Sequence, residues 1–221
     1  MDIRRTPDPQ SVAHEAAAHI ASRITAIISD RAICHLALAG GNTPKATYLL
    51  LREMNIDWSH LHIWFSDERC LPLGDPQRND SMVSNTLLMQ LPIPQSQLHP
   101  IAAELGADKA ARRYARELNS IDHLDIAVLG LGEDGHTASL FPGNDALALT
   151  DAAVPVFHAP KPPAERVSLS LQTIRQAGER IIIATGRDKH EPLMRILRGE
   201  SVPAKEVGEA IWFVDEAAIS T

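Results

Sequence analysis

One glycine-rich segment, residues 130–143, places an acid and an imidazole in a single short turn. It follows an apolar run over residues 124–129, which predicts a buried strand. Gly130, Gly132 and Gly135 allow the backbone to turn tightly and to approach a ligand closely. Asp134 and His136 lie two residues apart in this turn, and a carboxylate beside an imidazole is suited to general acid–base work. The segment predicts a reaction centre for a small molecule at the carboxyl end of a strand.

The same glycines match the G-x-G-x-x-G pattern of dinucleotide sites, which would indicate NAD binding. That pattern requires a long helix at the third glycine and an acid about 20 residues further on, after a second strand. Here the run over residues 137–141 is long enough for one helical turn, and Pro142-Gly143 ends it. We therefore interpret the segment as a catalytic turn and expect no NAD site.

A second glycine junction, residues 40–44, follows an apolar strand predicted over residues 32–39. Thr43 is a good N-cap, and Pro44 suits the first position of a helix predicted over residues 45–54. A glycine turn that leads into a helix N-terminus exposes amides that bind anions. The same features are typical of an ordinary strand-to-helix turn, and the G-x-x-x-x-G-K-[ST] sequence of a nucleotide P-loop is missing. The motif alone is compatible with a phosphate site or a plain turn.

Charged residues follow a third strand, predicted over residues 61–65. Asp67, Glu68 and Arg69 form either a solvated loop or a ligand-binding edge, because ligands bind at the carboxyl ends of parallel strands. His60 and His62 share one face of the preceding strand, but two histidines without a third ligand are weak evidence for a metal. We predict no metal site.

Strands alternate with helices along the whole chain, which is typical of an α/β layer fold. We expect a Rossmann-like, open, mostly parallel sheet flanked by helices, with room for a small additional lobe, in one domain over residues 1–221. Ser11 is the expected N-cap of the first helix. The predicted helices cover residues 11–29, 45–54, 81–91, 107–118 and 172–176 and a segment that ends near residue 198; the predicted strands cover residues 32–39, 61–65, 124–129, 154–157, 166–171, 180–185 and 211–214.

Composition excludes several classes of protein. The net charge is −7, with both signs spread along the chain, so no basic surface for nucleic acid is expected. No apolar run approaches the ~18 residues of a membrane helix. Residues 1–10 carry charges and prolines instead of the apolar segment of a secretory signal. Cys34 and Cys70 have no metal or redox spacing, and Cys34 lies in an apolar run. We expect a reduced, cytoplasmic protein.

Three motifs together resemble the 6-phosphogluconolactonase family, which forms a larger group with glucosamine-6-phosphate deaminase. They are residues 40–44, 67–72 and 132–143; they occur in family order and span most of the chain. The resemblance implies the Rossmann-like fold of that group, which ribose-5-phosphate isomerase and the CoA transferases share. It also implies hydrolysis of 6-phosphogluconolactone to 6-phosphogluconate, in the oxidative pentose phosphate pathway and without a cofactor. The implied partner is a small sugar phosphate, bound by a monomer or a small homo-oligomer.

The resemblance also implies roles for individual residues. Positions that match the phosphate-binding loop are Gly41, Asn42 and Thr43, and those that match the phosphate-pairing cations are Arg166 and Lys189. Positions that match the reaction centre are Asp67, Arg69, Asp134 and His136. A helix N-terminus together with two cations makes a strong phosphate site, which agrees with the capping pattern at residues 40–44.

Two departures separate the chain from its deaminase relatives. The deaminases carry a glutamate just before the Pro-Gly of the third motif, where this chain has Phe141. Their second motif continues Asp-Glu-Tyr, where this chain has Arg69 in the third place. Both differences favour the lactonase. A third departure is the stretch over residues 78–81, where many lactonases carry Ser-Asn-Tyr, so we assign no role to Asn79.

The expected mechanism is direct attack by water, because no G-x-S-x-G elbow is present and neither cysteine lies beside a histidine. His136 would act as the general base and return the proton to the ring oxygen. Asp134 or Asp67 would orient the imidazole, and Arg69 or backbone amides would stabilise the oxyanion. The alternatives are a glucosamine-6-phosphate deaminase, against which Phe141 argues, and a non-catalytic sugar-phosphate sensor, against which the Asp–His pair argues.

Overall fold

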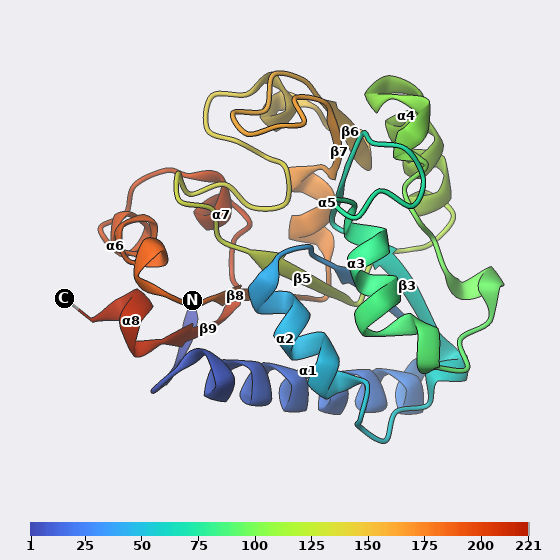
Figure 1. Ribbon diagram of the computed structural model, residues 1–221, viewed down its shortest axis with the longest axis horizontal. Coiled ribbons are helices and arrows are strands. Elements are labelled where there is room, and N and C mark those ends of the chain that lie inside the picture. Colours follow the sequence, from blue (N-terminus) through green and yellow to red (C-terminus); the bar gives the residue numbers. More distant parts are fainter. Residues whose placement is uncertain (221) are drawn as a thin grey trace.

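The computed structural model describes residues 1–220, and six of their strands form a fully parallel sheet in the order β1-β9-β8-β5-β2-β3 (Figure 1). The strands are β1 (Asp2–Thr6), β2 (Cys34–Leu38), β3 (Leu61–Phe65), β5 (Ile126–Gly130), β8 (Glu179–Ala184) and β9 (Ile211–Asp215). Continuous apolar runs such as that of β5 suit strands covered by helices on both faces. The predicted Rossmann-like, mostly parallel α/β fold is confirmed.

Three further strands form a small antiparallel sheet, in the order β4-β7-β6. They are β4 (Asp67–Arg69), β6 (Ala153–Val156) and β7 (Arg166–Leu169). Helix α4 (Ala107–Leu118) packs against β6 and β7, and together they form the small additional lobe (Figure 1). Residues 67–69 therefore belong to a strand. Their pairing with β7, which lies about 100 residues later in the chain, sets Arg69 opposite Arg166.

The order of the strands creates a crevice between β2 and β5. From β2 the chain passes through α2 (Asn42–Leu51) to β3 on one side, whereas the segment after β5 leads to β8 on the other side. The two loops at the carboxyl ends of β2 and β5 therefore diverge, which is the switch point where open α/β sheets bind ligands. Residues 40–44 and 130–143, the two glycine-rich motifs, are these loops.

The other helices complete the layers around the sheet. Helix α1 (Pro9–Arg31) packs beside α2 and against β9, and it runs along the lower edge of the molecule in Figure 1. The remaining α-helices are α3 (Asn79–Thr86), α5 (Leu171–Gln176), α6 (His190–Leu197), α7 (Pro203–Glu206) and α8 (Glu216–Ile219). Short 3₁₀ turns lie at Trp58–His60, Leu88–Gln90, Gln95–Gln97, Ala103–Leu105, Asp145–Ala148 and Arg187–Lys189.

Two predicted N-caps, Ser11 and Thr43, are wrong, both by a small shift. Helix α1 is capped by Asp8, whose carboxylate accepts the backbone N–H of Ser11 at 2.8 Å, so Ser11 lies inside the first turn. Helix α2 begins at Asn42, with Gly41 (φ 105°) as its N-cap, so Thr43 is not the capping residue. Glycine adopts this positive φ without strain, which lets the helix start two residues before Pro44.

Other differences arise where local patterns are weak. Strand β1 was not predicted because its sequence, Asp-Ile-Arg-Arg-Thr, is polar; it is an edge strand that pairs with β9 alone. Residues 137–141 form a tight turn instead of the expected helical turn. The backbone N–H of Leu140 donates to the carbonyl of Thr137 at 2.9 Å and closes this turn. Helices α7 and α8 are only four residues each, too short for a periodic pattern.

Three histidines that no predicted function uses gather far from the glycine-rich loops. His35 and His62 are paired in the parallel register of β2 and β3, and the Nδ1 atom of His62 lies 3.0 Å from Nε2 of His99. Trp64 stacks on His99 at 3.9 Å between ring centroids and donates from Nε1 to His35 at 3.1 Å. Burial, and to a smaller extent the two histidine neighbours His62 and His35, lower the pKa of His99 to about 4.

This cluster predicts a loss of stability in mild acid. An unfolded histidine has a pKa near 6.5, so below that pH the unfolded chain binds a proton that folded His99 refuses until about pH 4. Stability should therefore fall as the pH drops from 6.5 towards 4. We expect His99→Phe to reduce the loss between pH 7.5 and 5 by about 1 kcal/mol, after allowance for the partial exposure of the ring. Urea unfolding at the two pH values measures this loss of unfolding free energy, and the exposed His60→Asn is the control. An equal loss of stability in His99→Phe and His60→Asn would contradict the assignment of the effect to His99.

Candidate active site

The turn after β5 is closed by its own backbone. The N–H of Gly132 donates to the carbonyl of His136 at 2.8 Å, and the hydroxyl of Thr137 donates to the carbonyl of Gly130 at 2.9 Å. A Cβ atom at position 132 would lie 2.0 Å from Nδ1 of His136, so only glycine leaves room for the ring. In the pattern that resembles a dinucleotide motif, Gly132 thus makes room for the imidazole of His136.

Asp134 holds the imidazole of His136 in one orientation. Its Oδ1 atom lies 2.6 Å from Nδ1 of His136 and also accepts the backbone N–H of His136 at 3.0 Å. Burial raises the pKa of Asp134, but the hydrogen bonds and charge of His136 outweigh it, and the net pKa lies below the usual value. With Asp134 ionised, the proton of the neutral ring is held on Nδ1, and Nε2 is left as a base.

His136 faces a cavity of about 410 Å³ in the crevice between β2 and β5. The cavity is also lined by Gly41, Asp67, Arg69, Arg166 and Lys189, so the structure brings these five predicted residues together with His136. The remaining three predicted residues do not line it: Asp134 supports His136 from behind, Asn42 is exposed, and Thr43 is hydrogen-bonded to Thr185 at 2.9 Å between hydroxyls.

Four cationic side chains line the same cavity, of which the sequence analysis missed Lys161. Arg166 is 7% exposed, and its guanidinium donates to the carbonyls of Pro163 (3.2 Å) and Lys161 (2.8 Å). Burial lowers the pKa of Arg166, which the charge of Asp67 partly offsets. Lys161 pairs with Glu133 at 3.1 Å and Lys189 with Asp188 at 2.6 Å. A loop lysine next to two prolines has no periodic signal, and its place became visible only in the fold.

Arg69 carries a donor that the protein leaves unused. One guanidinium nitrogen of Arg69 donates to the carbonyl of Gln77, but its buried Nε atom has no hydrogen-bond partner among residues 1–220. A buried polar donor without a partner costs free energy, and it is commonly satisfied by a ligand in functional sites. Arg69 lines the cavity, so it brings positive charge close to an anionic oxygen bound there.

The carboxylate of Asp67 is engaged apart from the Asp134–His136 pair. It accepts the hydroxyl of Ser139 at 2.6 Å on one oxygen, and the side chain of Asn79 at 3.0 Å and the hydroxyl of Ser66 at 3.3 Å on the other. Of the two acids that the sequence left open as partners of His136, Asp134 makes the contact. Asn79, to which we assigned no role, lines the cavity and touches Asp67.

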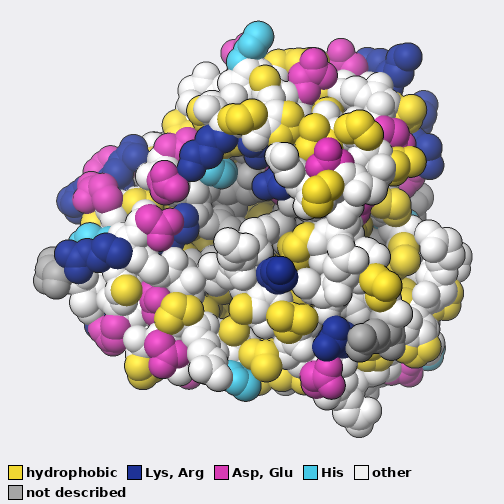
Figure 2. Space-filling model, viewed as in Figure 1, with side chains coloured by type: hydrophobic (Ala, Val, Ile, Leu, Met, Phe, Trp, Pro, Cys, Tyr) yellow, Lys and Arg dark blue, Asp and Glu magenta, His cyan; other side chains and the backbone are white. Residues whose placement is uncertain are grey.

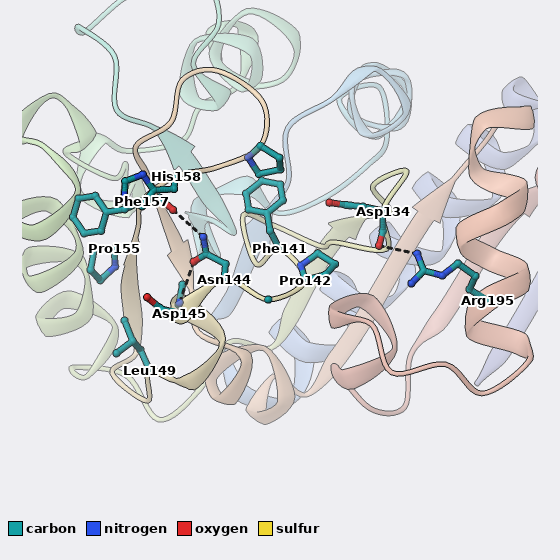
Figure 3. Close-up of a pocket in the computed structure, with 13 residues that line it drawn as sticks. Asp134, Phe141, Pro142, Asn144, Asp145, Leu149, Pro155, Phe157, His158 and Arg195 are labelled. Atoms are coloured by element: carbon teal, nitrogen blue, oxygen red, sulfur yellow. Dashed lines mark hydrogen bonds between the residues drawn. The ribbon is translucent and has the colours of Figure 1, made fainter.

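A second cavity of about 640 Å³, drawn in Figure 3, shares Phe141 with the first. Asn144 braces it by donating to the carbonyl of Phe157 at 2.8 Å, and Arg195 donates to the carbonyl of Asp134 at 3.2 Å. Its walls combine apolar side chains, among them two phenylalanines and three prolines, with polar ones such as Asp145 and His158. The smaller cavity is the better reaction site, because it contains the imidazole that Asp134 orients and four cationic side chains, whereas among residues 1–220 Arg195 is the one lysine or arginine that lines the larger cavity.

The surface agrees with this choice. Figure 2 shows lysine, arginine and histidine side chains beside the hollow between the upper and left-hand parts of the molecule. Within residues 1–220, no helix has the length and apolar character needed to cross a membrane. The described side chains also contain no group of three or more His, Cys, Asp or Glu residues placed to hold a metal ion.

Known proteins resemble this chain in both sequence and structure. The family described as glucosamine-6-phosphate isomerases/6-phosphogluconolactonase matches residues 7–213. A 6-phosphogluconolactonase of Streptomyces coelicolor is 33% identical over 238 residues, which cover 96% of this chain and 91% of that protein. The GDH/6PGL endoplasmic bifunctional protein of Homo sapiens is 34% identical over 82% of this chain, which spans 25% of that protein's length. The crystal structure of 6-phosphogluconolactonase from Thermotoga maritima matches with a TM-score of 0.91 and 28% identity, over 97% of this chain and 99% of the other.

Proposed function

Because this chain belongs to the glucosamine-6-phosphate isomerase/6-phosphogluconolactonase family, we propose that it hydrolyses 6-phosphogluconolactone to 6-phosphogluconate. The resemblance seen in the three motifs is thereby confirmed. The observation that carries the proposal is the imidazole of His136, fixed by Asp134, in one cavity with Arg69, Arg166 and Lys189. The reaction is a step of the oxidative pentose phosphate pathway, and the proposal includes neither a cofactor nor a metal.

The chemistry begins at Nε2 of His136, which takes a proton from a water molecule in the cavity. The water oxygen bonds to the lactone carbonyl carbon, and the carbonyl electrons move to its oxygen. The guanidinium of Arg69, a residue that lines the cavity, and backbone amides of the turn stabilise that oxyanion. When the tetrahedral intermediate collapses, the bond from carbon to the ring oxygen breaks, and His136 returns the proton to that oxygen. The charge of Asp134 stabilises the imidazolium between the two steps.

Substrate binding depends on the phosphate. Arg166, Lys189 and Lys161 present positive charge to the cavity, and the N-terminus of α2 begins directly after Gly41. Cations and helix N-termini are the two features that bind phosphate in proteins. Arg166 is in addition held by two carbonyls, so its position is set before substrate arrives. We propose that these groups hold the phosphate while the lactone lies beside His136.

The family also contains the glucosamine-6-phosphate isomerases, so the lactonase reaction needs its own argument. In this chain the ring of Phe141 packs against His136 with 4.5 Å between centroids. An aromatic ring at this position cannot accept a proton or a hydrogen bond from the imidazole, as the glutamate of the deaminases can. The histidine is thus supported by Asp134 alone, which suits the activation of water.

Activity on the two substrates tests the proposal. We expect purified protein to form 6-phosphogluconate from fresh 6-phosphogluconolactone well above the spontaneous rate, and to release no ammonia from glucosamine-6-phosphate. Ammonia release would replace the lactonase with the deaminase. Binding of sugar phosphates without either reaction would indicate the sensor class. A cytoplasmic location, a single domain and a monomer or small homo-oligomer remain predictions from the sequence.

A further inference from the structure

We propose that Glu68, which does not reach the cavity, is a positioning residue for the reaction centre: it caps helix α3 from the neighbouring strand and so holds Asn79 against Asp67. The inference rests on the proposed lactonase function, because its effect is read in turnover. None of the motifs suggested it, since Glu68 looked like one of three charged loop residues.

The cap is formed by a buried carboxylate. Glu68 is fully buried, and its two oxygens accept the backbone N–H groups of Asn79 at 2.7 Å and Asp80 at 2.8 Å. These are the first two N–H groups of α3, which have no partner inside the helix. Arg78, the residue at the N-cap position, makes no capping hydrogen bond with its side chain. The capping acceptor that α3 lacks in its own sequence is therefore supplied by Glu68 on β4.

The same carboxylate also holds its own strand. Its Oε1 atom accepts the backbone N–H of Arg69 at 2.8 Å, so a single side chain joins β4 to the N-terminus of α3. The guanidinium of Arg78 lies 3.9 Å from the carboxylate of Glu68 and forms ion pairs with Asp80 at 2.6 Å and Glu104 at 3.1 Å. Its positive charge compensates the acidic groups around the junction. Both segments that meet here carry residues of the cavity.

Asn79 connects the capped end of α3 to Asp67 through its side chain. With its backbone fixed by Glu68, Asn79 donates from Nδ2 to the backbone carbonyl of Asp67 at 2.8 Å and to its carboxylate at 3.0 Å. On its other side Asn79 meets Gly40, where an added Cβ would lie 1.8 Å from Oδ1 of Asn79. Asn79 is thus wedged between the loop after β2 and the acid of β4. Loss of the cap would free it to move and would displace Asp67 and Arg69.

Glu68→Gln tests the inference, because the amide keeps the size of the side chain but turns one acceptor into a donor facing an N–H group. We expect kcat for 6-phosphogluconolactone to fall about tenfold, with KM changed less than threefold, since misplaced groups cost turnover while the phosphate cations stay in place. The matched control is Asp125→Asn. Asp125 is a carboxylate of similar burial that accepts the backbone N–H of His35 at 2.8 Å, at the opposite end of β5 from the turn. It should lower the thermal midpoint without lowering kcat.

Asn79→Ala and the double variant with Glu68→Gln complete the test. If Glu68 acts through Asn79, the losses in kcat will not multiply, and the double variant will resemble Asn79→Ala alone. Unchanged kcat in Glu68→Gln, or losses that multiply, would overturn the inference. If Glu68→Gln yields no folded protein, a double-mutant cycle of Asn79→Ala and Ser139→Ala replaces it, because both side chains donate to the carboxylate of Asp67. Full turnover in Asn79→Ala would overturn the inference. An inactive wild-type protein would instead refute the proposed function.

Discussion

His136→Asn is expected to lower the turnover of 6-phosphogluconolactone by about 10²–10⁴-fold, the usual contribution of a positioned general base. The asparagine amide preserves a donor towards Asp134, which now contacts Nδ1 of His136 at 2.6 Å, but it cannot take a proton from water. KM should change little, because the cations that hold the phosphate are untouched. The residual rate is measured in assays quenched at fixed times. The spontaneous hydrolysis of the lactone is subtracted at each pH.

The control for this variant is His158→Asn. His158 lines the second cavity and is absent from the lining of the first, so its replacement should leave kcat unchanged (Figure 3). Turnover within a few-fold of wild type in His136→Asn would show that another group activates the water. Asp67 would then be the next candidate, since its carboxylate lines the same cavity.

Arg166→Ala is expected to raise KM for 6-phosphogluconolactone roughly 10²-fold, since loss of a buried guanidinium from a phosphate contact commonly costs that much affinity. The reason for so large an effect is the burial of Arg166, which is 7% exposed and pre-positioned by two carbonyls. Hydrolysis of unphosphorylated gluconolactone should be almost unaffected, because that substrate makes no phosphate contact. Initial rates over a range of both substrates measure the difference.

Two further variants separate charge from structure in this prediction. Arg166→Gln removes the charge but retains an amide that can donate to the carbonyls of residues 161–163, so it should resemble Arg166→Ala if the phosphate contact matters. Arg198→Ala removes an exposed guanidinium that pairs with Glu191 at 2.8 Å and should change neither substrate. An equal loss on both lactones in Arg166→Gln would contradict phosphate binding.

Much of this protein could be predicted because its information is local. The apolar runs of β2, β3, β5 and β8 are continuous in sequence, and the glycine-rich loops follow two of them directly. Once the sheet is parallel, all its carboxyl ends lie on one edge, so loops 40–44 and 130–143 are expected on that edge. That Gly41 and His136 line one cavity depends further on the pairing of β2 with β5, which the structure shows and the sequence did not predict.

Which acid supports His136 was not predictable from spacing. Asp134 follows β5 and Asp67 follows β3, at the same edge of the sheet, and the sequence favours neither. The choice depends on β4, which pairs with β7 about 100 residues away and turns the carboxylate of Asp67 towards Ser139 and Asn79. Pairing between distant short strands leaves almost no trace in sequence, because three residues carry no periodicity.

The capping role of Glu68 could not be predicted from the sequence either. Sequence patterns identify a helix cap within a few residues of the helix that it serves, and α3 has none there. Its cap comes from a strand eleven residues earlier, and it is useful only because folding buries the carboxylate beside two N–H groups. The sequence therefore determined the fold class, the family and six of the residues that line the cavity. The contacts among those residues were decided in three dimensions, because a hydrogen bond depends on distance and burial, and neither of these is a property of residue order.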